Sequence, residues 1–169
     1  MKKFEFTGET KVVFGKTLYR IRALVKIETE YLNVNPGDLG GWIEKEENLS
    51  HNGNAWVYGD ARVYGDAWVY GNARVYGNAW VYGDARVYGN AEVNKKEHIL
   101  TIGPIGSRND ITTFFRTKNN LIKVKCGCFT GTIDEFLAKV ELTHKDSKHA
   151  KVYKIATELA IAQIELENE

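Results

Sequence analysis

A glycine-rich loop with the sequence Gly-Pro-Ile-Gly-Ser-Arg-Asn-Asp carries the residue types of an anion-binding site. Gly103 and Gly106 allow backbone N–H groups to approach a ligand closely. Ser107 and Asn109 can donate hydrogen bonds, and the planar guanidinium group of Arg108 suits a phosphate. The loop is not a Walker loop, because it lacks the Gly-Lys-Ser/Thr ending and no helix begins directly after it.

A second segment, residues 127–132, ends where a helix is predicted to begin. The first turn of a helix presents unpaired N–H groups and the positive end of the helix dipole, which favour an anion. If the two loops converge, they form a site for a phosphorylated, nucleotide-sized ligand. The residues that we assign to this site are Gly103, Gly106, Ser107, Arg108, Asn109, Thr112, Thr113, Arg116, Thr130 and Thr132. The alternative is that both segments are ordinary turns followed by a helix cap.

Soft metal-binding side chains are few. Cys126 and Cys128, with His144 and His149, could in principle hold zinc. A single residue between the two cysteines is atypical of structural zinc, and a redox pair usually has two intervening residues. We therefore assign no metal ion, no cofactor and no catalytic residue.

Charge and hydropathy bound the class of protein. The 169 residues carry a formal net charge of +1, with 27% charged residues, so the composition does not indicate a nucleic-acid partner. The N-terminal Met-Lys-Lys-Phe-Glu is not followed by the apolar run of a signal peptide. No segment approaches the ~20 apolar residues that span a bilayer. We expect a cytoplasmic protein of one or two small domains, without a membrane partner.

Residues 53–94 consist of seven tandem six-residue repeats, of the form Gly-Asp/Asn-Ala-Trp/Arg-Val-Tyr, the last of which degenerates to Gly-Asn-Ala-Glu-Val-Asn. Four residues of each unit alternate as in a strand, so Ala and Val are predicted to face inward. The Gly-Asp or Gly-Asn pair forms a corner, because these residues tolerate left-handed backbone conformations. Three units then close a coil of roughly 18 residues.

The alternation of Trp and Arg has a geometric consequence. Because three units make one coil, a Trp in one coil is expected to lie against an Arg in the next, and the tyrosines form ladders. Such cation–π contacts contribute about 0.5–1 kcal/mol at exposed sites. The predicted outer face consists of Trp56, Arg62, Trp68, Arg74, Trp80, Arg86, Tyr58, Tyr64, Tyr70, Tyr76, Tyr82 and Tyr88. It either only stabilises the solenoid or also docks a partner, since these residue types are enriched in binding hot spots.

The repeats resemble the hexapeptide repeat of left-handed parallel β-helix proteins, in which an inward aliphatic residue recurs at every sixth position. The passage from Tyr-Arg-Ile-Arg-Ala at residues 19–23, through Gly-Gly-Trp-Ile-Glu at residues 40–44, to Asn-Leu-Ser at residues 48–50 resembles a family of bacterial and prophage hexapeptide-repeat proteins, often labelled acyltransferases. The resemblance implies a cytoplasmic protein of phage origin, acting in the host cell. Trimers are common among such solenoids, so a homo-oligomer is expected by analogy.

Acyltransferases of this type use a histidine on or beside the coils as a general base. His51 is the sole candidate here, because residues 53–94 contain no histidine. The repeats also provide barely more than two coils and no long extruded loop. Fold likeness alone does not carry function, so we do not expect acyl transfer.

The flanking segments complete a mainly β fold. Residues 1–52 are predicted to form an N-terminal β-hairpin cap, with a hairpin around Gly15-Lys16 and a turn at residues 35–38. Residues 95–169 are predicted to form a small α+β domain. In this domain, strands at residues 98–102, 112–117 and 121–126 precede a helix capped by Thr132 and Glu135 and a second helix over about residues 149–167. Between them lies the short left-handed parallel β-helix of residues 53–94.

These observations favour a non-catalytic binding protein for a phosphate-bearing, nucleotide-like molecule. In a phage setting this would suit sequestration of a host signalling nucleotide. One alternative is a protein-interaction scaffold that uses the Trp, Arg and Tyr faces, and another is an acyl-CoA-dependent acyltransferase that uses His51. Single-stranded nucleic acid on the aromatic ladders is disfavoured, because Asp60, Asp66 and Asp84 at the corners repel phosphates.

Overall fold

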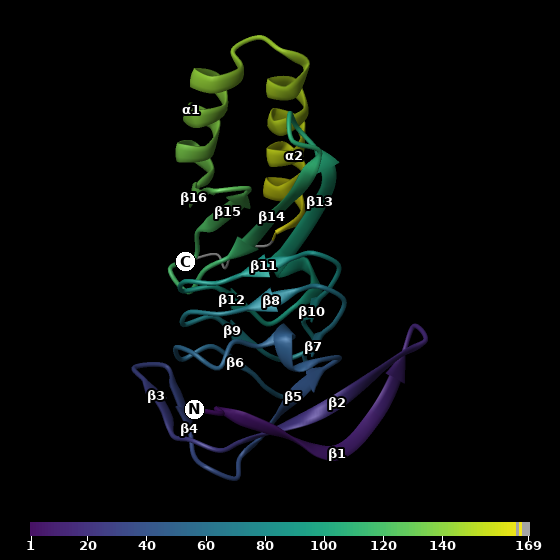
Figure 1. The fold of residues 1–169 in the computed structure, drawn as a ribbon. Helices are drawn as coiled ribbons and strands as arrows, with labels where there is room; N and C mark the ends of the chain where they lie inside the picture. Colours follow the sequence, from purple (N-terminus) through teal and green to yellow (C-terminus); the bar gives the residue numbers. More distant parts are fainter. Residues whose placement is uncertain (165, 167–169) are drawn as a thin grey trace. The chain divides into compact units, whose positions relative to one another are not determined.

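The structure of the protein is a computed structural model, and it describes residues 1–164 and residue 166 (Figure 1). The chain divides into two compact units, Met1–Lys96 and Glu97–Glu169. The segments predicted as a cap (residues 1–52) and as repeats (residues 53–94) both lie in the first unit. The described chain is mainly β, with two α-helices, both in the second unit.

The first unit begins with five ordinary strands and continues into very short ones. The ordinary strands are β1 (Phe4–Val13), β2 (Lys16–Ala23), β3 (Ile27–Thr29), β4 (Leu32–Val34) and β5 (Leu39–Ile43), followed by a 3-10 turn, η1 (Glu46–Asn48). The repeats provide β6 (Trp56–Val57), β7 (Arg62–Val63), β8 (Trp68–Val69), β9 (Arg74–Val75), β10 (Trp80–Val81), β11 (Arg86–Val87) and β12 (Glu92–Val93).

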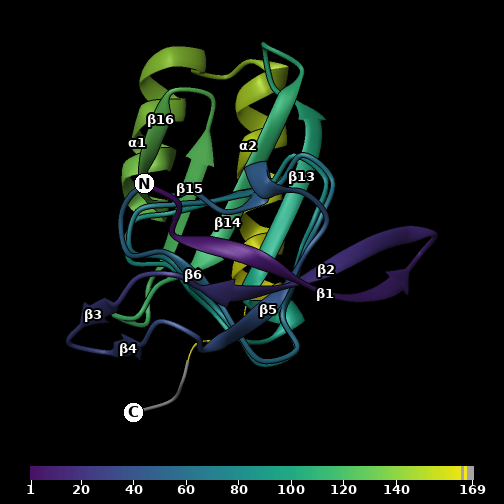
Figure 2. The same ribbon diagram turned by 60° about the horizontal axis from the view of Figure 1, so that its bottom comes forward.

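The repeats form a β-solenoid with three strands in each coil. Strands 18 residues apart pair in parallel, so β9 lies between β6 and β12, β10 lies beside β7, and β11 lies beside β8. Figure 2 shows the coils superimposed on one another. Every Ala and Val of the seven repeats has at most 1% of its surface exposed, which confirms that these residues face inward.

The corners of the solenoid depend on glycine. The seven repeat glycines have φ between 62° and 73°, in the left-handed region that other residues rarely adopt. At Gly77, a Cβ atom would also lie 2.5 Å from the carbonyl oxygen of Asn94 in the next coil. Both the backbone angle and the close approach of the coils therefore select glycine here.

The solenoid starts before Gly53, which the sequence analysis took as its first residue. Strand β5 pairs in parallel with β7, with Trp42 beside Arg62 and Ile43 beside Val63. An isolated bridge then joins Leu49 to Val69. Ile43 and Leu49 occupy inward positions and are buried, so they replace Val in a degenerate first coil. This coil is two residues longer than the others, and the regular six-residue pattern therefore misses it.

Two hairpins precede and flank this first coil. Strands β1 and β2 are antiparallel, and β2 also pairs with β5. The predicted hairpin is confirmed, although its turn is formed by Phe14 and Gly15, and Lys16 already belongs to β2. Strands β3 and β4 form a second hairpin, and residues 35–38 form the predicted turn, closed by a 3.0 Å bond from the Asp38 N–H to the Asn35 carbonyl.

The second unit is an antiparallel four-stranded sheet followed by two helices. A 3-10 turn, η2 (Lys96–His98), leads into β13 (Ile99–Ile105), β14 (Asp110–Arg116), β15 (Ile122–Cys126) and β16 (Phe129–Thr132), and then α1 (Ile133–His144) and α2 (Lys148–Gln163). The second helix ends at Gln163, with Ile164 as its C-cap, which corrects the expectation that it continues to about residue 167. Strand β16 corrects the sequence analysis, which took residues 127–132 as a loop.

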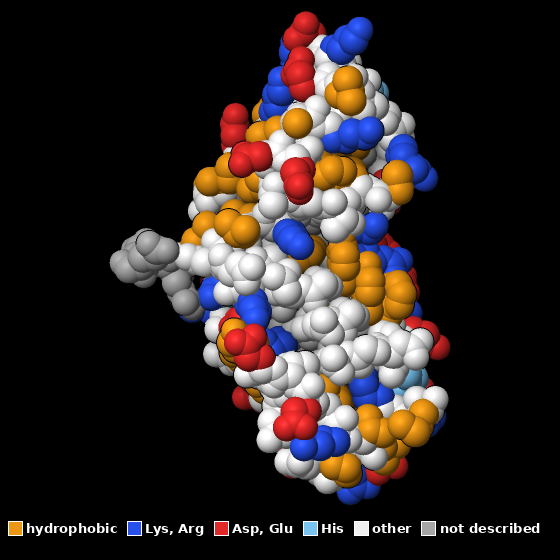
Figure 3. Space-filling model, turned by 90° about the vertical axis from the view of Figure 1, so that its left-hand side faces the viewer, with side chains coloured by type: hydrophobic (Ala, Val, Ile, Leu, Met, Phe, Trp, Pro, Cys, Tyr) orange, Lys and Arg blue, Asp and Glu red, His pale blue; other side chains and the backbone are white. Residues whose placement is uncertain are grey.

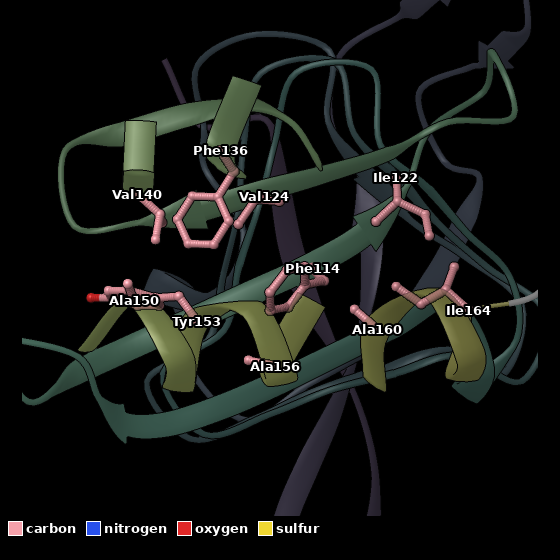
Figure 4. Packing of buried hydrophobic residues seen from close by; sticks show 10 residues of the cluster. All are labelled: Phe114, Ile122, Val124, Phe136, Val140, Ala150, Tyr153, Ala156, Ala160 and Ile164. Atoms are coloured by element: carbon pink, nitrogen blue, oxygen red, sulfur yellow. The ribbon is translucent and has the colours of Figure 1, made fainter. Parts of the chain in front are cut away.

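One hydrophobic core holds the second unit together. Phe114 and Val124 of the sheet pack with Phe136 of α1 and with Tyr153 and Ala160 of α2 (Figure 4). The predicted capping box is confirmed, because the Thr132 side chain accepts a bond from the Glu135 N–H while the Glu135 carboxylate accepts one from the Thr132 N–H. Such a box fixes where α1 begins and contributes about 1 kcal/mol.

Candidate functional site

The outward side chains of the solenoid stand in three columns, one for each side of the coil. The Trp56 column contains Trp56, Arg74, Glu92, Tyr58 and Tyr76; the Trp80 column contains Trp42, Arg62, Trp80, Tyr64 and Tyr82; the Trp68 column contains Trp68, Arg86, Tyr70 and Tyr88. The predicted placement of Trp beside Arg in neighbouring coils is confirmed in all three columns, and a cation–π contact accompanies it in the Trp80 and Trp68 columns. The register follows from three units per coil.

The tyrosine ladders are also confirmed. The rings of Tyr58 and Tyr76 are 4.9 Å apart and inclined by 5°, and those of Tyr70 and Tyr88 are 4.8 Å apart and inclined by 6°. Burial raises the pKa of Tyr88 to about 12. Burial together with a hydrogen bond to Glu92 likewise raises the pKa of Tyr76 to about 12. These phenols therefore stay neutral well above their ordinary range.

The Trp56 column is covered by another part of the chain. Trp56 has only 1% of its surface exposed, so its assignment to an accessible face is wrong. Arg74 donates a 2.9 Å hydrogen bond to the carbonyl of Tyr31, in the turn between β3 and β4, and its guanidinium lies 5.6 Å from the Tyr31 ring centre. Arg74 also pairs with Glu92. This arginine thus joins the β3–β4 hairpin to the solenoid.

The Trp80 column is covered by the β1–β2 hairpin. Phe14, at the tip of the hairpin, packs edge-on against Trp80 with ring centres 5.4 Å apart. The ammonium groups of Lys11 and Lys96 lie over the rings of Trp42 and Trp80, at 4.1 Å and 3.8 Å respectively. The expected stack of Arg62 on Trp80 is present at 5.1 Å. The two tryptophans of this column are therefore contacted by other side chains of the chain, whereas Tyr82 is exposed.

The Trp68 column is the one whose tryptophan and arginine are both exposed. Trp68 has 37% of its surface exposed, and Arg86 is exposed as well. The Trp68 ring stacks on Tyr70 at 4.1 Å, and the Arg86 guanidinium lies 5.7 Å from it. Beside this column is an open groove of about 900 Å³. The side chains around it include four carboxylates and two cations, namely Glu46, Glu47, Asp66, Asp84, Lys45 and Arg86.

The charges of this groove are partly organised by short contacts. The Lys45 ammonium lies 2.6 Å from the Asp66 carboxylate, and this hydrogen bond lowers the pKa of Asp66. A hydrogen bond from His51 is the main cause that lowers the pKa of Glu46. Both carboxylates are therefore ionised at neutral pH. Space-filling colouring shows acidic and basic side chains interspersed with hydrophobic ones over one face of the molecule (Figure 3).

His51 is held by both of its ring nitrogens. Nδ1 accepts a 3.1 Å hydrogen bond from the backbone N–H of Lys3, and Nε2 lies 2.7 Å from the Glu46 carboxylate. Since Nδ1 accepts, Nε2 must carry the proton that is donated to Glu46. The ring also stacks on Phe4, with centres 4.5 Å apart. A general base needs a free lone pair beside its substrate, and neither nitrogen of His51 offers one in this arrangement.

In the second unit, the two predicted loops do converge. The turn between β13 and β14 and the turn between β15 and β16 lie at the same end of the strands, as the strand registers require. Ser107 and Arg108 from the first turn and Gly127 from the second line a cavity of about 190 Å³. The Arg108 guanidinium reaches to within 3.8 Å of where a Cβ at Gly127 would stand.

Several predicted ligand residues lie away from this cavity. Thr112 and Thr113 lie within β14 and are buried in the sheet. Arg116 is also buried, with a guanidinium nitrogen 3.4 Å from the His98 ring. Thr132 is occupied in capping α1, and Thr130 is exposed on β16. The assignment of these residues to one ligand pocket is therefore wrong.

The backbone conformation and packing of the β13–β14 turn explain why Gly103, Gly106 and Asn109 occur there. A Cβ at Gly103 would lie 2.9 Å from the Asp110 carbonyl oxygen, and one at Gly106 would collide with Tyr153. Asn109 has φ 48°, as asparagine often does in turns. These residues shape the turn, and of the predicted set Ser107 and Arg108 remain to face the cavity.

The expected helix N-terminus is not part of the cavity. Strand β16 returns antiparallel to β15, so α1 begins at the opposite end of the strands. The residues of α1 that line the cavity lie later in the helix, namely Lys139, Val140, Thr143 and His144. Tyr153 of α2 completes the wall. These five residues were not predicted as part of a site, although the spacing of Lys139 with Thr143 and of Val140 with His144 already places each pair on one helix face.

Neither a metal centre nor a membrane span is found among the described residues. No group of three or more His, Cys, Asp or Glu side chains in residues 1–164 and 166 is arranged to hold a metal ion. The Cys126 thiol instead donates to the Tyr153 hydroxyl at 3.6 Å, and the His144 ring lies 5.7 Å from that of Tyr153. No helix of the described chain combines the length and hydropathy needed to cross a bilayer.

Comparison with known proteins supports the solenoid. A model of the family described as YdcK beta solenoid repeat matches residues 55–71 and 67–83. The matched residues fall within the tandem repeats and agree with the three-strand coils seen in the structure. No curated protein matches the chain in sequence. The repeats therefore define a β-solenoid. The family description names a repeat and does not name an activity.

Proposed function

We propose that this protein is a non-catalytic binding protein whose solenoid docks a partner protein on the Trp68 column. The solenoid itself is, in this proposal, a left-handed β-helix of the hexapeptide type, with residues 1–38 as its N-terminal cap. The single observation that carries the docking role is the unequal covering of three columns with the same repeat sequence. Hairpins of the chain contact Arg74 in the Trp56 column and Trp80 in the Trp80 column, whereas Trp68 and Arg86 are both exposed beside a groove of about 900 Å³.

The chemistry of the groove selects a basic partner segment. Four carboxylates face two cations around it, so its net charge is negative at neutral pH. An exposed indole attracts a Lys or Arg side chain through its π face, by about 0.5–1 kcal/mol. Tryptophan and arginine together are typical of the central residues of protein interfaces. A Lys- or Arg-rich segment of another protein fits both features.

The non-catalytic part of the proposal is supported by His51. Its two nitrogens are committed to Lys3 and Glu46, and the ring is packed on Phe4. Turnover of acetyl-coenzyme A by the full chain that is lost in His51→Ala would establish acyl transfer in place of this proposal.

Fluorescence anisotropy with short labelled peptides tests the docking face. A Lys/Arg-rich peptide should bind the full chain and a Glu-rich peptide of equal length should not, and raised salt should weaken binding. Trp68→Ala should weaken binding about tenfold, because an anchor of this kind contributes more than 1 kcal/mol. Tyr82→Ala is the matched control, since Tyr82 is an exposed aromatic on the Trp80 column.

Two outcomes would contradict the proposal. One is equal binding of the basic and acidic peptides, and the other is an equal loss of affinity in Trp68→Ala and Tyr82→Ala. If sedimentation instead shows an oligomer that Trp68→Ala converts to a monomer, the occupant of the face is a second copy of this chain and not a basic partner.

A further inference from the structure

A second cavity lies wholly within the second unit, and its floor is aromatic. Phe129, Phe136, Val140 and Tyr153 form that floor. The Phe136 ring centre is 5.3 Å from that of Phe129 and 5.4 Å from that of Tyr153. Such a surface accepts one ring or a short aliphatic group edge-on or face-on.

Its rim carries two cationic side chains. Arg108 comes from the β13–β14 turn and Lys139 from α1, and within the described part of the chain neither forms an ion pair. Asp110 is the one carboxylate among the described lining residues. The last turns of α1 also point their carbonyl dipoles here, but that opposes an anion by only about 0.3–1 kcal/mol. The two positive charges exceed the negative charge of Asp110 by one, and this net positive charge outweighs the effect of the dipole.

Neutral donors complete the rim. Ser107 offers a hydroxyl beside Arg108. The Tyr153 hydroxyl accepts a bond from the Cys126 thiol and keeps its own proton, because burial raises the pKa of Tyr153. Cys126 is itself oriented by a 3.3 Å hydrogen bond from Thr112 in the sheet. The polar groups at the cavity are thus fixed by the core beneath them.

We propose that this cavity binds a small anion with a single apolar ring or short aliphatic body. Arg108 and Lys139 hold the carboxylate or phosphate group, and the body rests on Phe129, Phe136 and Tyr153. The volume of about 190 Å³ is below the roughly 300–1,000 Å³ of sites for larger ligands. A whole nucleotide, which was expected from the sequence, is therefore too large for this cavity. The proposed ligand keeps the anionic group of a nucleotide but has a smaller body.

Isothermal titration calorimetry on the full chain tests this proposal with four probes: phenyl phosphate, benzoate, inorganic phosphate and AMP. Phenyl phosphate and benzoate should bind with dissociation constants on the order of 0.1–1 mM, as expected for ligands of this size. Inorganic phosphate and AMP should bind at least about tenfold more weakly. Arg108→Gln and Lys139→Gln should each weaken phenyl phosphate binding about tenfold, because each removes a charge-assisted hydrogen bond.

A matched control and a second measurement keep the test decisive. Lys151→Gln makes the same charge change on an exposed part of α2 that does not line the cavity, and it should leave affinity unchanged. In the unaltered chain, bound phenyl phosphate should slow alkylation of Cys128, which lines the cavity and is exposed, as followed on its own peptide by mass spectrometry. Equal affinity for phenyl phosphate and inorganic phosphate, tight binding of AMP, an equal loss in Lys151→Gln, or unprotected Cys128 would each overturn the proposal.

Discussion

The hydroxyl of Tyr153 fills the space that a side chain at Gly106 would occupy. The turn between β13 and β14 therefore packs directly on α2, and the absence of a side chain at residue 106 allows this approach. The same turn holds Arg108, so the glycine that permits the packing also sets the rim of the cavity. Gly106 was predicted from the sequence to contact a ligand, but its role in the structure is to let the turn pack against Tyr153.

Gly106→Ala should destabilise the second unit by about 3 kcal/mol. The change places a side chain at φ 74° and forces it against Tyr153, which adds an overpacking cost to the backbone cost. Gly127→Ala is the control, because Gly127 also has positive φ but its nearest neighbour is an Arg108 nitrogen 3.8 Å away. Measured by urea unfolding, Gly127→Ala should lower the free energy of unfolding by about 1 kcal/mol. Equal losses would show that the contact with Tyr153 contributes nothing.

The tyrosine ladders predict a loss of stability at high pH. Tyr76 and Tyr88 have pKa values of about 12 in the folded protein, against about 10 in an unfolded chain. Above pH 10 the unfolded chain releases these protons first, so the free energy of unfolding falls as the pH rises from 10 to 12. Absorbance at 295 nm should show phenols that ionise late in the native protein and near pH 10 in denaturant. Tyr88→Phe should remove part of the late-ionising fraction.

Lys3 predicts the opposite trend over a lower range. Its side chain is 3% exposed, donates a 2.7 Å bond to the Ala55 carbonyl, and has its pKa lowered to about 8 by burial. Between pH 8 and 10.4 the unfolded chain binds this proton and the folded chain does not, so stability should rise with pH, by up to about 1.4 kcal/mol per unit. Lys3→Met should abolish this slope, whereas Lys2→Met, at a solvent-exposed residue, should keep it.

The covering of Trp80 by the β1–β2 hairpin can be tested directly. Phe14→Ala should red-shift the tryptophan fluorescence and lower stability by about 0.5–1.5 kcal/mol, because the edge-on ring contact is lost. Val12→Ala, at a position 71% exposed in the same hairpin, should change neither property. An unshifted spectrum in Phe14→Ala would mean that the hairpin does not cover Trp80 in solution.

Repeats made the solenoid predictable, and breaks in the repeat limited the prediction. The inward Ala and Val and the pairing of Trp with Arg follow from a period of six and three units per coil. The first coil was missed because Ile43 and Leu49 take the place of Val and two residues are inserted after them. The burial of Trp56, and the contact of the β3–β4 hairpin with Arg74 in the same column, were missed because a local repeat says nothing about segments that are distant in the sequence.

The cavity was only half predictable for a similar reason. Ser107 and Arg108 were found because glycine-rich turns have a recognisable composition. Lys139, His144 and Tyr153 come from helices whose docking depends on tertiary packing. Residues 127–132 were predicted as a loop, but they contain β16. The prediction therefore placed the start of α1 at the wrong end of the strands. That single assignment turned a helix end into an expected anion site.

The stacked columns predict that exchanging two partners costs less stability than the sum of the two single changes. Trp68→Arg would set a new guanidinium against Arg86 on the next coil, and Arg86→Trp would remove the cation above Trp68. The double exchange restores one ring and one cation at adjacent positions, so it should recover about 0.5–1 kcal/mol relative to the sum of the single changes. Trp68→Arg combined with Arg62→Trp, which are not stacked neighbours, is the control and should be additive. Additivity in both pairs, measured by urea unfolding, would mean that the stacks do not contribute to stability.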